Sequence, residues 1–104
     1  MTAAHATALD ALVGAARERL DALHEANERL DGIRVRLTSP DGLVTVVADG
    51  SGAMVELELA ENLGSVAAHT LASTITAVAA QAAAAALDQR EAILQSLQGS
   101  FTDS

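Results

Sequence analysis

The hydrophobic period of the chain changes twice, and no other feature limits its fold so strongly. Over residues 2–31, apolar residues recur at alternating steps of four and three, which is the period of a helix. Over residues 33–59, apolar and polar residues mostly alternate, as on strands with one buried face. The helical period returns over residues 65–98. The pattern predicts an α+β fold in which two long helices flank three strands.

The first predicted helix, residues 2–31, carries an unbroken heptad seam, and Gly32 directly after it is a helix stop signal. The seam consists of Leu9, Val13, Ala16, Leu20, Leu23, Asn27 and Leu30. Such a seam predicts packing against a second helix, in a dimer or within the fold. Its polar member, Asn27, either fixes the register of a dimer or contacts water near the end of the seam.

Three short strands are predicted between the helices, at about residues 33–39, 42–48 and 53–59. Residues 39–42 (Ser-Pro-Asp-Gly) and 49–52 (Asp-Gly-Ser-Gly) are turn sequences, so the strands should form a three-stranded antiparallel meander. The middle strand is apolar on both faces, which places it in the middle of a sheet that is covered on both sides. The apolar residues of the third strand should face the core.

The second predicted helix, residues 65–98, has Ser65 as a candidate N-cap and should end at Gly99, before a flexible tail at 99–104. One apolar stripe consists of Leu71, Ile75, Val78 and Ala82, and Leu87, Leu94 and Leu97 continue the apolar side. Residues 66–87 carry no charge, but only five of them are strongly hydrophobic. The segment is therefore interpreted as an alanine-rich packing helix and not as a membrane span.

The formal net charge of -8 is spread along the chain, and each third of the sequence is acidic. This distribution gives the protein no electrostatic attraction to phosphate backbones. Lysine is absent, whereas alanine occurs 24 times, a composition typical of a GC-rich bacterial genome. The absence of lysine excludes a phosphate-loop lysine, a Schiff-base lysine and a lysine general base.

The chemistry-bearing residue types are few and scattered. Cysteine is absent, which excludes disulfides and thiolate metal sites. The histidines, His5, His24 and His69, have no second histidine at helical spacing. No nucleophile and base, metal-ligand cluster or phosphate loop can be recognised. The sequence therefore predicts no enzyme activity, no metal or other cofactor, and no small-molecule substrate.

A chain of 104 residues is expected to form a single domain, residues 1–104, and small domains often need a second subunit for stability. The two predicted helices would be about 45 and 50 Å long, whereas strands of seven residues span only about 23 Å. The helices should therefore overhang the sheet and expose the apolar seam. A second subunit that covers the free face of the sheet, or pairs along an edge, would bury these surfaces.

The order of helix, meander and long helix resembles the YbaB/EbfC family over about residues 5–98. Residues 42–59, Gly-Leu-Val-Thr-Val-Val-Ala-Asp-Gly-Ser-Gly-Ala-Met-Val-Glu-Leu-Glu-Leu, are similar to the core pattern of that family, an apolar strand and an alternating strand joined by an Asp-Gly turn. The resemblance implies a tweezer-like homodimer with projecting helices, located in the cytoplasm, that binds duplex DNA and associates with the nucleoid. Some similar actinobacterial proteins are linked to specialised secretion loci, where a role in binding other proteins is more natural.

Six arginines are the candidate DNA contacts: Arg17, Arg19, Arg29, Arg34, Arg36 and Arg90. The first three are interleaved with acidic residues, as on a solvated helix face. Arg34 and Arg36 either contact DNA or pair with Glu56 and Glu58 of the third strand. The seam Leu9, Val13, Leu20, Leu23, Asn27 and Leu30 is the candidate dimer or helix contact.

Two functions remain open. The first is a homodimeric nucleoid-type protein that binds DNA weakly and largely without sequence preference. The alternative is an acidic paralogue that no longer binds DNA and acts as an adaptor or chaperone for another protein. No membrane partner is expected. A continuous surface of arginines would favour the first function, and arginines paired internally with glutamates would favour the second.

Overall fold

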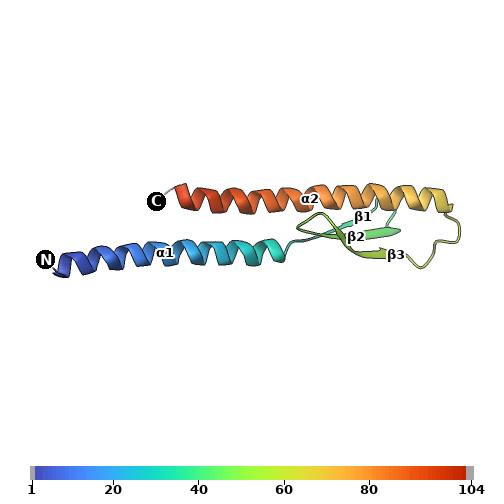
Figure 1. The fold of residues 1–104 in the computed structure, drawn as a ribbon. Helices are drawn as coiled ribbons and strands as arrows, with labels where there is room; N and C mark the ends of the chain where they lie inside the picture. Colours follow the sequence, from blue (N-terminus) through green and yellow to red (C-terminus); the bar gives the residue numbers. More distant parts are fainter. Residues whose placement is uncertain (1, 103–104) are drawn as a thin grey trace.

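The computed structural model describes residues 2–102, with side chains from residue 7 onward. The elements are α1 (Thr2–Asp31), β1 (Arg34–Thr38), β2 (Val44–Asp49), β3 (Met54–Leu59) and α2 (Ala68–Thr102). The strands form one antiparallel sheet in the order β1-β2-β3. Figure 1 shows this sheet beside the first half of α2. The second half of α1 runs alongside the second half of α2, and the first half of α1 extends past the C-terminal end of α2. The predicted α-β-β-β-α order and the meander are confirmed.

Helix α1 ends where the glycine signal predicts. The backbone N–H of Gly32 donates to the carbonyl of Glu28 at 3.0 Å, and that of Ile33 donates to the carbonyl of Leu30 at 3.3 Å. These two bonds satisfy carbonyl groups that a helix end otherwise leaves open. The chain then enters β1 directly, so α1 points away from the sheet as an extension of the first strand (Figure 1).

The first turn joins β1 to β2 through a buried serine. The backbone N–H of Gly42 donates to the carbonyl of Ser39 at 2.9 Å, and Gly42 has a positive φ of 75°. The hydroxyl of Ser39 donates to Asp41 and accepts the backbone N–H of Val44 at 3.1 Å. The hydrogen bond from Ser39, and a second one from the backbone N–H of Leu43, hold the pKa of the Asp41 carboxyl below its ordinary value.

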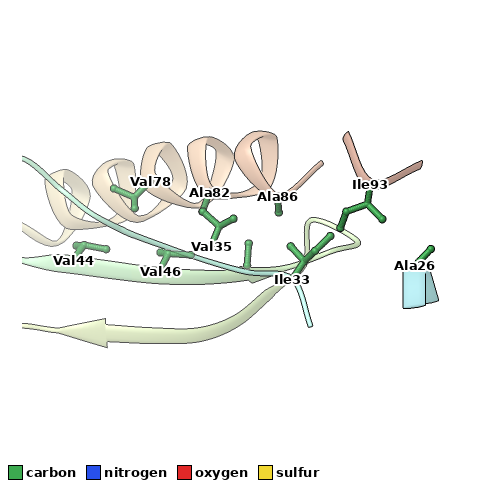
Figure 2. Packing of buried hydrophobic residues seen from close by; sticks show 10 residues of the cluster. Ala26, Ile33, Val35, Val44, Val46, Val78, Ala82, Ala86 and Ile93 are labelled. Carbon is green, nitrogen blue, oxygen red and sulfur yellow. The ribbon is translucent and has the colours of Figure 1, made fainter. Parts of the chain in front are cut away.

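The core lies between α2 and one face of the sheet (Figure 2). Val44 and Val46 of the central strand are fully buried, and they lie opposite Val78, Ala82 and Ala86 of the helix. Alanines at this contact let the helix backbone come close to the strands, so the valine side chains fill the space between the two layers. The alanine run thus forms a packing surface, as the sequence predicts.

Among the described residues a helix covers only one side of the sheet, and the cover predicted for its other side, by a second subunit, stays a prediction. Val47 faces the other side and is nevertheless 8% exposed. Its register partners are Arg36 on β1 and Glu56 on β3. The Arg36 side chain crosses the central strand to reach β3, and its aliphatic part shields the valine.

The third strand differs most from its prediction. Every residue of β3 is exposed, although Leu57 and Leu59 lie opposite Val46 and Val44 and therefore share the face that packs on α2. Helix α2 lies over β1 and β2, which leaves the apolar side of β3 uncovered. Leu57 and Leu59 therefore lie on the face that the sequence predicts, but a single chain leaves them exposed.

Both predicted ends of α2 need correction. Ser65 is not the N-cap, because it lies in a turn in which the N–H of Val66 donates to the carbonyl of Leu63, and the helix begins only at Ala68. At the other end the sequence predicts that a flexible tail begins at residue 99, but the helix continues through Gly99 to Thr102. The hydroxyl of Thr102 donates to the carbonyl of Gln98 at 3.1 Å, and Phe101 is half-buried. The last two residues of the predicted tail, 103–104, lie outside the described residues.

The whole protein is elongated. Its extents are 83 × 20 × 15 Å and its radius of gyration is 22.2 Å, whereas a compact domain of this length has about 13 Å. By length and composition α2 is apolar enough to cross a membrane. Only 17% of its most apolar segment is buried within the chain. The helix thus packs through one face, and most of its surface is left for solvent or for another molecule.

Candidate nucleic-acid interface

The six arginines come from three elements of the protein. Arg17, Arg19 and Arg29 project from α1, Arg34 and Arg36 from β1, and Arg90 from α2; all six are exposed. Arg19 and Arg29 each line a hollow between the helices together with a glutamate of α1. Arg34 and Arg90 line one hollow, and the other four arginines do not line it.

Arg36 is paired within the sheet. One guanidinium nitrogen donates to Glu58 at 2.6 Å, and the other lies 3.8 Å from Glu56. The pairing with both glutamates of β3 matches one of the two predicted uses of this residue. All three side chains are about half exposed, so the pair contributes little to stability. Because the two glutamates neutralise its charge, Arg36 is less available to contact a phosphate group.

Arg34 takes a different direction from its neighbour. Its guanidinium donates to the carbonyl of Ile33 at 2.7 Å and to the carbonyl of Asp31, the last residue of α1, at 3.4 Å. An arginine placed at the C-terminal end of a helix is stabilised by the negative end of the helix dipole. Two backbone acceptors therefore orient the guanidinium, and its remaining N–H groups stay available.

Arg34 and Arg90 meet at one hollow of about 240 Å³, at the junction of α1, the sheet and α2. The lining residues are Leu30, Asp31, Arg34, Asp49, Gly50, Ser51 and Arg90. A Cβ on Gly50 would lie 2.9 Å from the carbonyl oxygen of Leu30, so a glycine is needed for the turn to approach the helix end. Within the described residues neither arginine forms an ion pair with a carboxylate.

The turn between β2 and β3 supplies a fixed negative charge to the same hollow. The hydroxyl and backbone N–H of Ser51 both donate to Asp49, as does the N–H of Ala53, and the positive charge of Arg34 adds to them. Together these donors hold the pKa of Asp49 below its ordinary value, with the Ser51 hydroxyl as the largest cause. The hollow therefore presents two arginines to an anion, opposed by the carboxylates of Asp49 and Asp31.

A family model for the YbaB/EbfC DNA-binding family matches residues 6–101. The chain belongs to the YbaB/EbfC family. No curated protein and no solved structure matches it. The matched range includes both helices almost entirely and the whole sheet, so the residues that line the arginine hollow lie within it.

The heptad seam of this YbaB/EbfC protein is exposed. Leu9, Val13, Leu20 and Leu23 are about half exposed, Asn27 is exposed, and only Leu30 packs partly against the core. Helix α1 instead contacts α2 through Ala22 and Ala26, of which Ala26 is buried beside Ile93 (Figure 2). Sequence reasoning missed this alanine stripe, although Ala15, Ala22 and Ala26 recur at helical spacing.

Other chemistry is sparse in the part of the chain that the structure describes. No group of three or more His, Asp or Glu side chains lies close enough there to hold a metal ion. His69 lines a shallow exposed hollow on α2 with alanine, serine and threonine side chains. Sequence reasoning also missed Asp31, Asp49 and Ser51 as neighbours of the arginines; the Asp-Gly turn was recognised, but its contact with the end of α1 was not.

Proposed function

We propose that the protein is a homodimeric DNA-binding protein of the nucleoid that binds duplex DNA weakly and largely without sequence preference. The observation that carries the proposal is the hollow that Arg34 and Arg90 share, within a chain of a DNA-binding family. In this hollow each of the two guanidinium groups, which come from different elements, can contact one of two neighbouring backbone phosphates. We therefore assign the main phosphate contacts to these two residues.

The charges around the hollow favour weak binding. Asp31 and Asp49 line it, and the net charge of the chain is -8, so long-range electrostatics oppose the approach of DNA. Contacts to phosphates alone carry no information about the base sequence. A protein that relies on them binds different duplexes with similar affinity and is displaced by salt.

The uncovered third strand supports the homodimer. β3 is an edge strand with Met54, Val55, Leu57 and Leu59 each 40–50% exposed. An exposed apolar edge is a site for pairing with another strand, and an isologous contact would present the same strand from both copies. A dimer formed through β3 would contain two such hollows and would therefore present four arginines, Arg34 and Arg90 of each copy. The cytoplasm is the location that fits a nucleoid role.

The test is a fluorescence-anisotropy titration of a labelled duplex at several salt concentrations, with dimer formation measured by light scattering on the same sample. Four phosphate contacts predict a slope of about -3.6 for log K against log salt. Duplexes of unrelated sequence should give similar affinities. A folded dimer that does not bind even at low salt would contradict the proposal and favour the adaptor role instead.

The dimer contact is tested separately with a Leu57→Glu/Leu59→Glu variant. Two carboxylates on the edge strand should prevent pairing and leave a monomer, with circular dichroism that still shows both helices. Thr76→Glu, on the exposed face of α2, is the matched control. If the β3 variant remains a dimer, another surface forms the contact.

A further inference from the structure

The longest exposed apolar surface outside the proposed dimer edge runs along α1. Leu9, Leu12, Val13, Leu20 and Leu23 are between 46% and 68% exposed. They continue the seam on a helix whose contact with α2 uses other residues. From Leu9 to Leu23 the seam spans about 21 Å, or about four helical turns. Leucines spaced in this way form the surface into which another helix packs.

The two flanks of the seam differ. On one side, about 110° around the helix, lie the alanines Ala15, Ala22 and Ala26, which line the contact with α2. On the opposite side, again about 110° away, lies an acidic edge. Its charged residues are Asp10, Arg17, Asp21 and Glu28, all exposed. From Ala15 to Ala26 the seam is bounded by the second helix of its own chain. On its other side lies the edge with three carboxylates and one guanidinium.

We propose that the α1 seam binds an amphipathic helix of another protein that has basic residues along one flank. The leucines would receive the apolar face of that helix, and Asp10, Asp21 and Glu28 would meet its lysines or arginines. The occupant is not a second α1, because that helix carries six acidic residues against three arginines and would bring like charge to the acidic edge.

The experiment uses the full-length protein and two synthetic 21-residue helical peptides. Both peptides have leucine at the seam positions of three heptads; one has lysine at the flanking positions and the other has glutamate. Affinities are measured by isothermal titration calorimetry for the wild type, for Leu20→Gln in the seam, and for Leu94→Gln. Leu94 is an exposed leucine of α2 and serves as the matched control.

The expected result is binding of the lysine peptide to the wild type and to Leu94→Gln with similar affinity. Leu20→Gln should bind at least about tenfold more weakly, because a buried leucine contributes that much to an apolar contact. The glutamate peptide should not bind. Equal binding of both peptides, or equal binding to Leu20→Gln and Leu94→Gln, would overturn the proposal, as would no binding at all.

Light scattering on the same variants shows whether the α1 seam binds a helix of another protein or a second copy of this chain. If Leu20→Gln lowers the oligomeric state while Leu94→Gln does not, the seam is a contact between copies of this chain and the proposal is wrong. Neither variant should change DNA affinity, because both residues lie outside the Arg34 and Arg90 hollow. Failure of the helix-docking proposal is thereby distinguishable from failure of the DNA proposal.

Discussion

The two halves of α2 are packed in different ways. Its first half lies on the sheet, where Ala82 and Ala86 are fully buried against valines. Its second half lies beside α1, where hollows of about 140 and 190 Å³ interrupt the contact and Ile93 is the main buried residue (Figure 2). Strands supply a broad surface for a helix, whereas an alanine stripe on one helix fills the groove of another only in part. The sheet region should therefore carry most of the stability.

The most damaging change should be Ala82→Leu. Ala82 is fully buried between α2 and the sheet, so three extra carbons must displace the strands, at about 3 kcal/mol of unfolding free energy. Ala84→Leu, on the exposed side of the same alanine run, should change stability by about 0.5 kcal/mol or less. Urea denaturation followed by circular dichroism measures both. Similar effects of the two substitutions would mean that the sheet contact is not close-packed.

In the helix pair the corresponding change, Ile93→Ala, should be milder. Ile93 is 8% exposed, and the hollow beside it gives the neighbouring side chains room to adjust, so we expect about 2 kcal/mol, the lower end for such truncations. Leu94→Ala is the matched control because that leucine is 40% exposed. Amide hydrogen exchange should show the loss of protection in residues 87–102 and little change in β2. Uniform loss over the whole chain would indicate that the two regions unfold as one.

Arg36→Ala should have a still smaller effect on stability. Its ion pairs with Glu58 and Glu56 are about half exposed, so their removal and the uncovering of Val47 together should cost about 1 kcal/mol or less. DNA affinity should not fall, because this arginine is already paired. A clear loss of DNA binding in Arg36→Ala would show that the pair opens on DNA and would extend the interface onto the open face of the sheet.

The smallest effect concerns pH and the turn that closes the hollow. Asp49 has a pKa below its ordinary value of 3.8 because its hydrogen bonds favour the carboxylate. The folded state therefore binds fewer protons than the unfolded state, and the contribution of Asp49 is complete above pH 3.8 and is lost as the pH falls through the lower folded value.

Asp49→Asn keeps an acceptor oxygen but removes the charge. It should lower stability at pH 7, and the difference from the wild type should narrow on acidification below pH 3.8. Urea midpoints at pH 7 and at low pH measure this change. Asp88→Asn, on the exposed surface of α2, is the control. A difference that does not depend on pH would show that the charge of Asp49 is not what stabilises the turn.

The period and the turn residues predicted the elements well, because both signals are local. Gly32, the turn at 39–42 and the Asp-Gly turn ended their elements as expected, since proline fixes its own φ and glycine readily adopts the positive φ seen at Gly42 and Gly52, whatever surrounds them. The ends of α2 were missed for a related reason. Ser65 has the right chemistry for a cap but is held in a turn, and Gly99 is kept helical by the residues around it.

The candidate site was less predictable, because it depends on which surfaces remain uncovered. An alternating strand such as β3 indicates that one face prefers burial, but the sequence does not say whether the cover comes from the same chain. Arg34 and Arg36 look equivalent in the sequence, yet one turns back to the end of α1 and the other crosses the sheet. The partnership of Arg34 with Arg90 depends on packing between residues 56 positions apart.

The central claim is that Arg34 and Arg90 together hold DNA phosphate, and its most direct test is a comparison at equal charge. Anisotropy titrations at low salt should be made with Arg90→Gln, with Arg34→Gln and with Arg17→Gln, each of which removes one positive charge. The account predicts that the first two weaken binding about tenfold and reduce the salt slope by about 1.8 per dimer, whereas Arg17→Gln has a much smaller effect. Equal weakening by all three would contradict the account, because DNA would then respond to net charge and not to this hollow.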